Sequence, residues 1–124
     1  MDHPILRGRS ILVVEDELLI AMDIAQALER AGANATMTTT VRHALILIEH
    51  DGLSGAIMDH GLTDGDSLQV CARLKERGIP YLSYSGYEPV PGASKDAPFI
   101  TKPVSMDVLM SAMEELLAGP PRVS

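Results

Sequence analysis

The 124-residue sequence contains one cysteine, no long apolar run and no apolar stretch near its first residue. A single cysteine, Cys71, excludes an internal disulfide bond, and we expect its side chain to be buried as a small apolar group. No apolar run approaches the roughly 20 residues of a membrane-spanning helix. The first residues, MDHPILRGRS, also lack the apolar core of a signal peptide. These absences predict a cytoplasmic protein in a reducing compartment.

Positive charge is also scarce. Ten Lys and Arg residues against 17 Asp and Glu residues give a formal net charge of −7 at pH 7, and Arg7 and Arg9 form the only basic cluster. Proteins that bind nucleic acid or anionic membranes use clustered lysine and arginine, so we expect neither partner. The histidines indicate no metal site, since His43 and His50 lie about 10 Å apart along a helix.

The length fits one domain, because the chain has no linker-like stretch and no internal repeat. We expect an N-terminal extension over residues 1–9, a domain over residues 10–118 and a flexible C-terminal tail over residues 119–124. A separate effector domain has no room in this sequence. Any output of the protein is therefore expected to act through protein contacts.

Strand-like and helical patterns alternate along the chain. Short apolar or alternating runs predict strands at 10–16, 33–39, 54–59, 79–86 and 99–101. Apolar residues at helical spacing predict helices at 17–30, 40–50, 67–78 and 105–118, with Thr40 and Ser105 as caps. Residues 88–98 contain three prolines and are expected to form a loop. This alternation implies right-handed crossovers and a doubly wound α/β fold with a parallel sheet.

Polar residues end four of the five expected strands: Glu15 and Asp16, then Asp59, Ser85 and Lys102. Ligands of such sheets bind at the carboxyl ends of the strands, so these side chains are expected to meet. Crowded carboxylates repel one another unless a cation neutralises them, and Mg²⁺ prefers oxygen ligands. Lys102 and Ser85 suit the oxygens of a phosphoryl group. Asp59 is the candidate nucleophile toward phosphorus, forming an acyl phosphate.

These motifs resemble those of the receiver domains of two-component response regulators, over about residues 10–118. The matching pieces are VVEDE with Glu15 and Asp16, IMDHGLTDGDS with Asp59, IPYLSYSG with Ser85, and FITKP with Lys102. The resemblance implies a flavodoxin-like, five-stranded sheet in the order 2-1-3-4-5. It also implies a phosphoacceptor signalling protein, not an enzyme, which catalyses only its own phosphorylation and dephosphorylation.

The resemblance assigns a role to each matching residue. Asp59 is implied as the phosphoacceptor and, together with Asp16, as a direct Mg²⁺ ligand. Glu15 would act on the ion through water, and the backbone carbonyl of Gly61 would be a further ligand. Ser85 and Lys102, by the same resemblance, would hold the phosphoryl oxygens.

The region between Ser85 and Lys102 departs from most receivers. The two residues are only 17 positions apart, which predicts a shortened or remodelled fourth helix. Phe99 matches the aromatic switch position, so Ser85 and Phe99 are expected to move together on phosphorylation. SYSGY and PFITKP are similar to the FAT-GUY signature and the PFxFKP motif of one receiver subgroup, with Ser83 and Tyr84 replacing Phe and Ala.

Two surfaces are candidates for partner contacts. Leu19 projects among polar residues of the first helix, where receivers meet a sensor histidine kinase or a histidine phosphotransfer protein. The last helix carries an apolar arc of about 200°, wider than the stripe of somewhat over 100° that packing requires. We expect a core-facing arc and an exposed edge for dimerisation or kinase docking. The arc is Val108, Leu109, Ala112, Met113 and Leu116, and the edge is Met106, Met110 and Leu117.

Two other functions compete with a stand-alone receiver. One is a receiver-shaped scaffold that binds partners without being phosphorylated. The other is a phosphatase of the haloacid dehalogenase type, which also forms an aspartyl phosphate at a strand end. That enzyme needs a second acid two residues after the nucleophile, where this sequence has Gly61.

Overall fold

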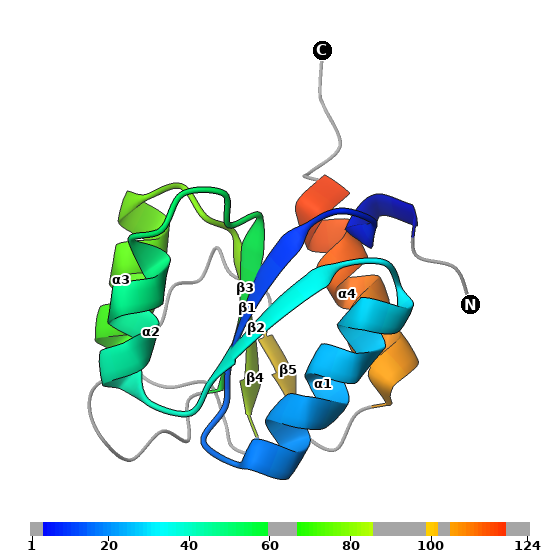
Figure 1. The fold of residues 1–124 in the computed structure, drawn as a ribbon, viewed down its shortest axis with the longest axis horizontal. Helices are drawn as coiled ribbons and strands as arrows, with labels where there is room; N and C mark the ends of the chain where they lie inside the picture. The colour runs from blue at the N-terminus through cyan, green and yellow to red at the C-terminus, as the bar shows by residue number, and fades with distance from the viewer. Residues whose placement is uncertain (1–3, 60–66, 86–98, 102–104, 119–124) are drawn as a thin grey trace.

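A computed structural model describes residues 4–59, 67–85, 99–101 and 105–118, and these residues form one parallel sheet with helices on both faces (Figure 1). The elements, in chain order, are a short 3-10 helix η1 (Pro4–Leu6), β1 (Ser10–Val14), α1 (Leu18–Arg30), β2 (Asn34–Thr38), α2 (Val41–Ile48), β3 (Gly55–Asp59), α3 (Ser67–Glu76), β4 (Tyr81–Ser85), β5 (Phe99–Thr101) and α4 (Met106–Ala118). The strand order β2-β1-β3-β4-β5 confirms the predicted flavodoxin-like topology.

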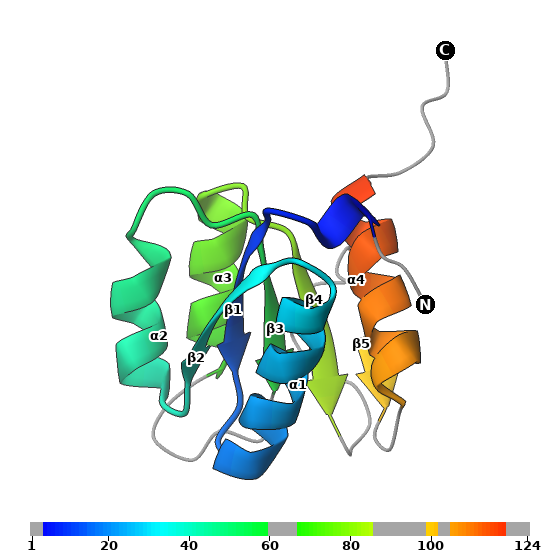
Figure 2. The same ribbon diagram turned by 45° about the vertical axis from the view of Figure 1, so that its right-hand side comes forward.

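Two apolar layers hold the sheet between its helices. Alternate residues of β1 point to opposite faces: Ile11 and Val13 join a cluster with α1 and α4, whereas Leu12 and Val14 join a cluster with α2 and α3. Figure 2 shows the two helix pairs on their respective sides of the sheet. Burial on both faces explains why the central strands are continuous apolar runs. Cys71 is buried in the second cluster, as predicted.

The predicted caps of two helices are confirmed. Thr40 Oγ1 accepts a hydrogen bond from the His43 N–H at 3.1 Å, and Ser105 Oγ accepts one from the Val108 N–H at 3.2 Å. Each bond satisfies a backbone donor that the first turn of a helix leaves without an intrahelical partner. No described helix has the length and apolar character that crossing a membrane requires.

An ionic cluster joins the C-terminal ends of α2 and α3. Arg73 donates from Nε and Nη2 to the two carboxylate oxygens of Glu49, at 2.6 and 2.7 Å. Arg77 donates to the carbonyl oxygen of Ile48 at 3.0 Å and to Asp51 Oδ1 at 3.1 Å. The hydrogen bond from Arg73 lowers the pKa of Glu49 below its ordinary value and raises that of Arg73. The cluster therefore ties the two helices together and caps α2.

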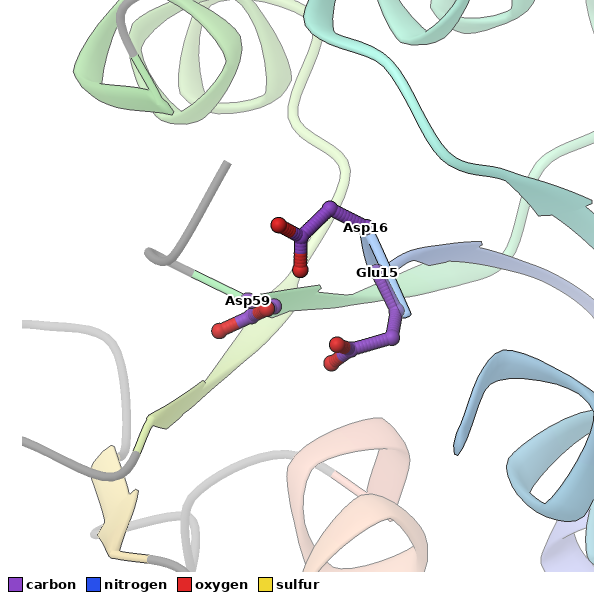
Figure 3. A group of neighbouring side chains, drawn as sticks. All are labelled: Glu15, Asp16 and Asp59. Atoms are coloured by element: carbon purple, nitrogen blue, oxygen red, sulfur yellow. The ribbon is translucent and has the colours of Figure 1, made fainter. Parts of the chain in front are cut away.

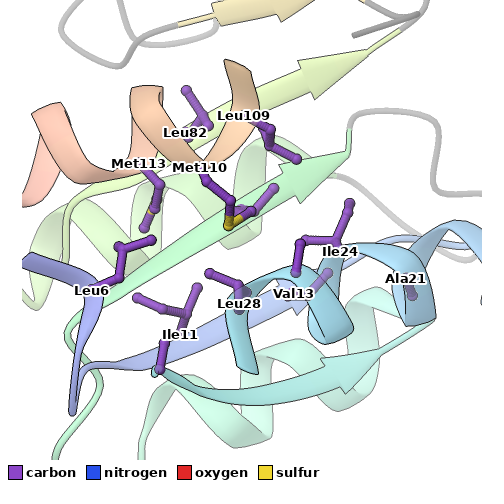
Figure 4. Close-up of a cluster of buried hydrophobic side chains, with 13 residues drawn as sticks. Leu6, Ile11, Val13, Ala21, Ile24, Leu28, Leu82, Leu109, Met110 and Met113 are labelled. Atoms are coloured by element: carbon purple, nitrogen blue, oxygen red, sulfur yellow. The ribbon is translucent and has the colours of Figure 1, made fainter. Parts of the chain in front are cut away.

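The described residues before β1, within the predicted N-terminal extension, pack against the rest of the fold. Leu6 is fully buried in the same cluster as Ile11 and Met113, and Figure 4 shows it at one end of that cluster. The backbone N–H of Ile5 donates to Glu114 Oε2 of α4 at 3.1 Å. The short Ile-Leu pair has no periodicity, so the sequence alone gave no sign of this packing.

The buried side of α4 differs from the predicted one. Met110, expected at an exposed edge, is only 3% exposed, and Val108, expected in the core, is 53% exposed. Met106 and Leu117 are partly buried against the core. Met113 and Leu117 pack over the bare backbone at Gly55, where a Cβ would lie 2.7 Å from Met113 Cε and 3.1 Å from Leu117 Cδ2. Met110 is buried in the same cluster as Leu6. An exposed methionine edge on α4 is thus a wrong prediction.

Several predictions concern residues outside the described ranges. The shortened or remodelled fourth helix falls within residues 86–98, and the flexible tail comprises residues 119–124. Gly61 and Lys102 also lie outside the described part of the chain.

Candidate functional site

Three carboxylates meet at the carboxyl ends of two neighbouring strands. Glu15 and Asp16 directly follow β1, and Asp59 is the last residue of β3. The pairing of Val14 with Met58 places these strand ends side by side. One ligand atom from each carboxylate lies within 4.8 Å of those of the other two, and Figure 3 shows the three side chains gathered there. The predicted acidic cluster therefore exists in the structure.

Burial makes this cluster unusual. Glu15 is 1% exposed and Asp59 is 3% exposed, while Asp16 is partly exposed. Acidic side chains are seldom buried to this degree unless a partner compensates their charge. The set of three oxygen donors fits a hard divalent cation, which binds carboxylates in preference to nitrogen or sulfur ligands. The cluster can thus hold a metal ion, with the partly exposed Asp16 on its solvent side.

The backbone fixes Glu15 on two sides. Its N–H donates to the carbonyl oxygen of Thr38 at 3.0 Å, which continues the pairing of β1 with β2 past the end of β1. Its carboxylate oxygen Oε1 accepts the backbone N–H of Glu17 at 3.2 Å. Glu17 is the N-cap residue of α1, so the acidic pair is joined directly to the start of that helix.

Thr38 is a neighbour of the site that the sequence did not single out. It is 3% exposed, and its hydroxyl lies 3.1 Å from His43 Nδ1 of α2. The N–H of Thr40 also donates to this hydroxyl, at 3.4 Å. Thr38 therefore connects the start of α2 to Glu15. A hydroxyl residue at the end of an edge strand, just before a capping threonine, was the signal available in the sequence.

The strands that carry the remaining candidates lie beside β3. Asp59 pairs with Tyr84, so Ser85 follows by one position at the end of β4. Ser85 pairs with Thr101 of β5, and Phe99 pairs with Ser83. The backbone thus brings Ser85 to the same edge of the sheet as the acidic cluster. Phe99 begins β5 two positions before the partner of Ser85.

An exposed apolar surface adjoins the acidic cluster on α1. Leu19, the predicted contact residue, is 76% exposed, and Leu18 and Met22 are 55% and 38% exposed. These side chains lie on the first turns of α1, immediately after Glu17. We call this group the α1 surface: Leu18, Leu19 and Met22. Of these three residues, only Leu19 was predicted from the sequence as a contact residue.

Solved structures with the same architecture are response regulator receivers. A CheY-like receiver domain protein from Methanospirillum hungatei JF-1 is 27% identical, with a TM-score of 0.80 over 90% of this chain and 94% of that chain. A receiver protein from Sinorhizobium medicae WSM419 has a TM-score of 0.83 and 22% identity over 92% of this chain. A response regulator from Burkholderia pseudomallei, with a phosphorylated aspartic acid, a calcium ion and citrate, has a TM-score of 0.75 and 21% identity. The last two show the fold alone.

Curated relatives include regulators of transcription and of photosynthesis. The transcriptional regulatory protein TcrA of Mycobacterium tuberculosis is 29% identical over 118 residues, which are 88% of this chain and 46% of TcrA. The photosynthetic apparatus regulatory protein RegA of Rhodobacter capsulatus is 30% identical over 69 residues, or 38% of RegA. The matched region is 46% of TcrA and 38% of RegA, so the chain spans less than half the length of either relative.

The chain therefore has the fold of response regulator receiver domains, with an acidic cluster at the carboxyl ends of its strands, and its curated relatives are response regulators. No protein-family model matches the sequence.

Proposed function

We propose that the chain receives a phosphoryl group on Asp59 from the phosphohistidine of a sensor histidine kinase or of a phosphotransfer protein. The observation that carries this proposal is the buried Asp59 carboxylate at the end of β3, beside Glu15 and Asp16, in a receiver fold. A carboxylate oxygen of Asp59 attacks phosphorus, and the P–N bond of the donor breaks. The imidazole leaves with the electron pair of that bond.

Charge neutralisation is the main requirement of this transfer, because the nucleophile and the phosphoryl group are both anionic. We propose Asp16 and Asp59 as direct ligands of Mg²⁺, with Glu15 acting through water. When bound, the ion supplies the positive charge that offsets the three carboxylates and the phosphoryl oxygens. The roles of Gly61 as a carbonyl ligand and of Ser85 and Lys102 as phosphoryl contacts remain proposals that rest on the sequence motifs.

The signal is proposed to end by hydrolysis and to pass on by protein contact. Attack of water on phosphorus releases inorganic phosphate and restores the Asp59 carboxylate. The proposed switch between the phosphorylated and the unphosphorylated protein is a joint movement of Ser85 and Phe99. The exposed α1 surface, next to the cluster, is the proposed contact for the phosphodonor. We place the protein in the cytoplasm, where sensor kinases present their phosphohistidine.

Phosphorylation with a small donor tests this function. The protein is incubated with Mg²⁺ and acetyl phosphate or phosphoramidate, and intact mass is followed over time. We expect the wild type to gain one phosphoryl group in a reaction that chelation of Mg²⁺ stops. The Asp59→Asn variant, which keeps the size of the side chain, should gain none.

The opposite result has a clear meaning. If the wild type gains no mass, and beryllofluoride with Mg²⁺ changes neither its spectrum nor its stability, Asp59 is not a phosphoacceptor. The chain would then act as a phosphorylation-independent scaffold. Equal gain by the wild type and Asp59→Asn would place the phosphoryl group on a different residue.

A further inference from the structure

Glu15 makes a contact that binding a cation does not require. Its side chain is 1% exposed, and Oε1 accepts the backbone N–H of Glu17 at 3.2 Å. Glu17 is the N-cap residue of α1, and its own side chain makes no capping hydrogen bond. A carboxylate near the N-terminus of a helix is stabilising, because the N–H groups there lack intrahelical partners. Glu15 therefore supports the start of α1 from outside the helix.

The same carboxylate belongs to the acidic cluster. Its ligand atom lies within 4.8 Å of those of Asp16 and Asp59, so the three negative charges repel one another at neutral pH. A cation held by the three carboxylates would offset this repulsion and keep them together. The Glu15 carboxylate that would bind the cation is the one that accepts the Glu17 N–H. The state of the cluster is in this way linked to the first turn of α1.

That first turn carries the α1 surface. Leu18 follows Glu17 directly, and the first helical hydrogen bond runs from the Ala21 N–H to the Glu17 carbonyl oxygen at 3.0 Å. Leu19 and Met22 lie on the same two turns and are 76% and 38% exposed. A loosened Glu17 would leave these apolar side chains on a frayed helix end. A fixed Glu17 holds them in one arrangement.

We infer that Glu15 is a positioning residue that couples cation binding to the order of the α1 surface. This inference rests on the proposed function, because it assigns the α1 surface to the phosphodonor. It adds that the receiver presents an ordered docking surface when its acidic cluster is loaded and a less ordered one when it is empty. The coupling passes through one hydrogen bond, from the Glu17 N–H to Glu15 Oε1.

Amide hydrogen exchange, measured by NMR on the whole chain, tests the coupling. In the wild type, saturating Mg²⁺ should slow exchange of the amides from Glu17 to Ala21 by about fivefold or more, the low end of usual coupling between sites. Amides at the C-terminal end of α4, beside Ile5, should change much less and serve as an internal control. No slowing in the wild type would overturn the inference.

Two substitutions at the same position separate the hydrogen bond from the charge. Without Mg²⁺, Glu15→Ala removes the acceptor and should speed exchange of the Glu17 amide by about fivefold or more. Glu15→Gln keeps an acceptor oxygen and should exchange at nearly the wild-type rate. If Glu15→Ala exchanges like the wild type, or Glu15→Gln exchanges like Glu15→Ala, the bond does not hold the helix start.

A last comparison isolates the response to the cation. Glu15→Ala retains Asp16 and Asp59, and its loading is followed by the shift of the Asp59 amide resonance as Mg²⁺ is raised. In the loaded variant, the amides from Glu17 to Ala21 should slow by less than half of the wild-type effect. Equal slowing would show that the coupling bypasses Glu15. Phosphorylation of Asp59, measured by mass, can succeed whatever these exchange rates show, so failure of the coupling and failure of the proposed function are distinguishable.

Discussion

At the scale of single residues, close packing at one glycine decides the position of a helix. Gly55 begins β3 where α4 crosses the sheet. A Cβ there would lie 2.7 Å from Met113 Cε, 3.1 Å from Leu117 Cδ2 and 3.2 Å from the Pro80 carbonyl oxygen. The methionine end can shift, but the carbonyl is part of the backbone. Any side chain larger than hydrogen at Gly55 would therefore press against α4 and against the backbone just before β4.

Gly55→Val should lower the free energy of unfolding by about 2 kcal/mol, within the usual cost of overpacking a core. Valine suits a β-strand, so the loss would come from packing and not from strand propensity. Urea denaturation measures the change. Gly52→Ala is no suitable control because Gly52 has a φ of +97°, and Ser54→Ala would remove the acceptor of the Ser10 N–H. The matched comparison is Gly55→Ala, which adds only the Cβ and should lose less stability than Gly55→Val. A Gly55→Val variant as stable as the wild type would contradict the close approach of α4.

The acidic cluster shows how far residue identity predicts a site. Strand ends in a parallel sheet meet at one edge, so the sequence order of Glu15, Asp16 and Asp59 was enough to predict their meeting. It was not enough to predict that Glu15 would bond to the Glu17 N–H. That contact depends on the path of the backbone between β1 and α1, which no pattern of residue types specifies.

At the scale of elements, periodicity predicted where strands and helices lie but not how each helix is turned. The core-facing side of α1 was predicted well, because its polar and apolar sides are distinct. The arc on α4 is so wide that many orientations bury a similar number of apolar groups. Contacts from Leu6 and Gly55, distant in sequence, selected the orientation that buries Met110 and exposes Val108.

The contact between α2 and α3 should make the stability of the protein depend on pH through Glu49. The hydrogen bond from Arg73 lowers the pKa of Glu49 in the folded protein. The contribution of Glu49 to the free energy of unfolding is therefore complete at pH values above its ordinary pKa of 4.5. This contribution is lost as the pH falls through the lower pKa of the folded state. Glu49→Gln should therefore be less stable than the wild type at neutral pH. The difference should shrink as the pH is lowered below about 4.5.

Thermal unfolding of both proteins across this pH range measures the effect. Both side chains are substantially exposed, so the difference should be small and should weaken in high salt. Arg73→Gln should show the same pH profile, and the double variant should be little worse than either single one. Additive losses would mean that Glu49 and Arg73 act independently.

At the scale of the whole molecule, the N-terminal segment is part of the folded unit. Leu6 is fully buried between β1, α1 and α4, and Ile5 donates to Glu114. Leu6→Ala should lower the free energy of unfolding by about 2–5 kcal/mol, as for other buried leucines. Pro4→Ala, at an exposed position of the same turn, should change it little. Urea denaturation of the two variants makes the comparison, and a neutral Leu6→Ala would contradict the packing seen here.

Among the described residues, several ties between segments lie at the end of the fold opposite the acidic cluster. Glu49 and Asp51 meet α3 there, Ile5 meets Glu114, and Gly8 donates to the Gly32 carbonyl oxygen at 2.8 Å. Local opening costs more free energy where such contacts are dense. A partner that binds at the acidic end therefore acts on a fold whose opposite end is held by contacts between segments far apart in the sequence.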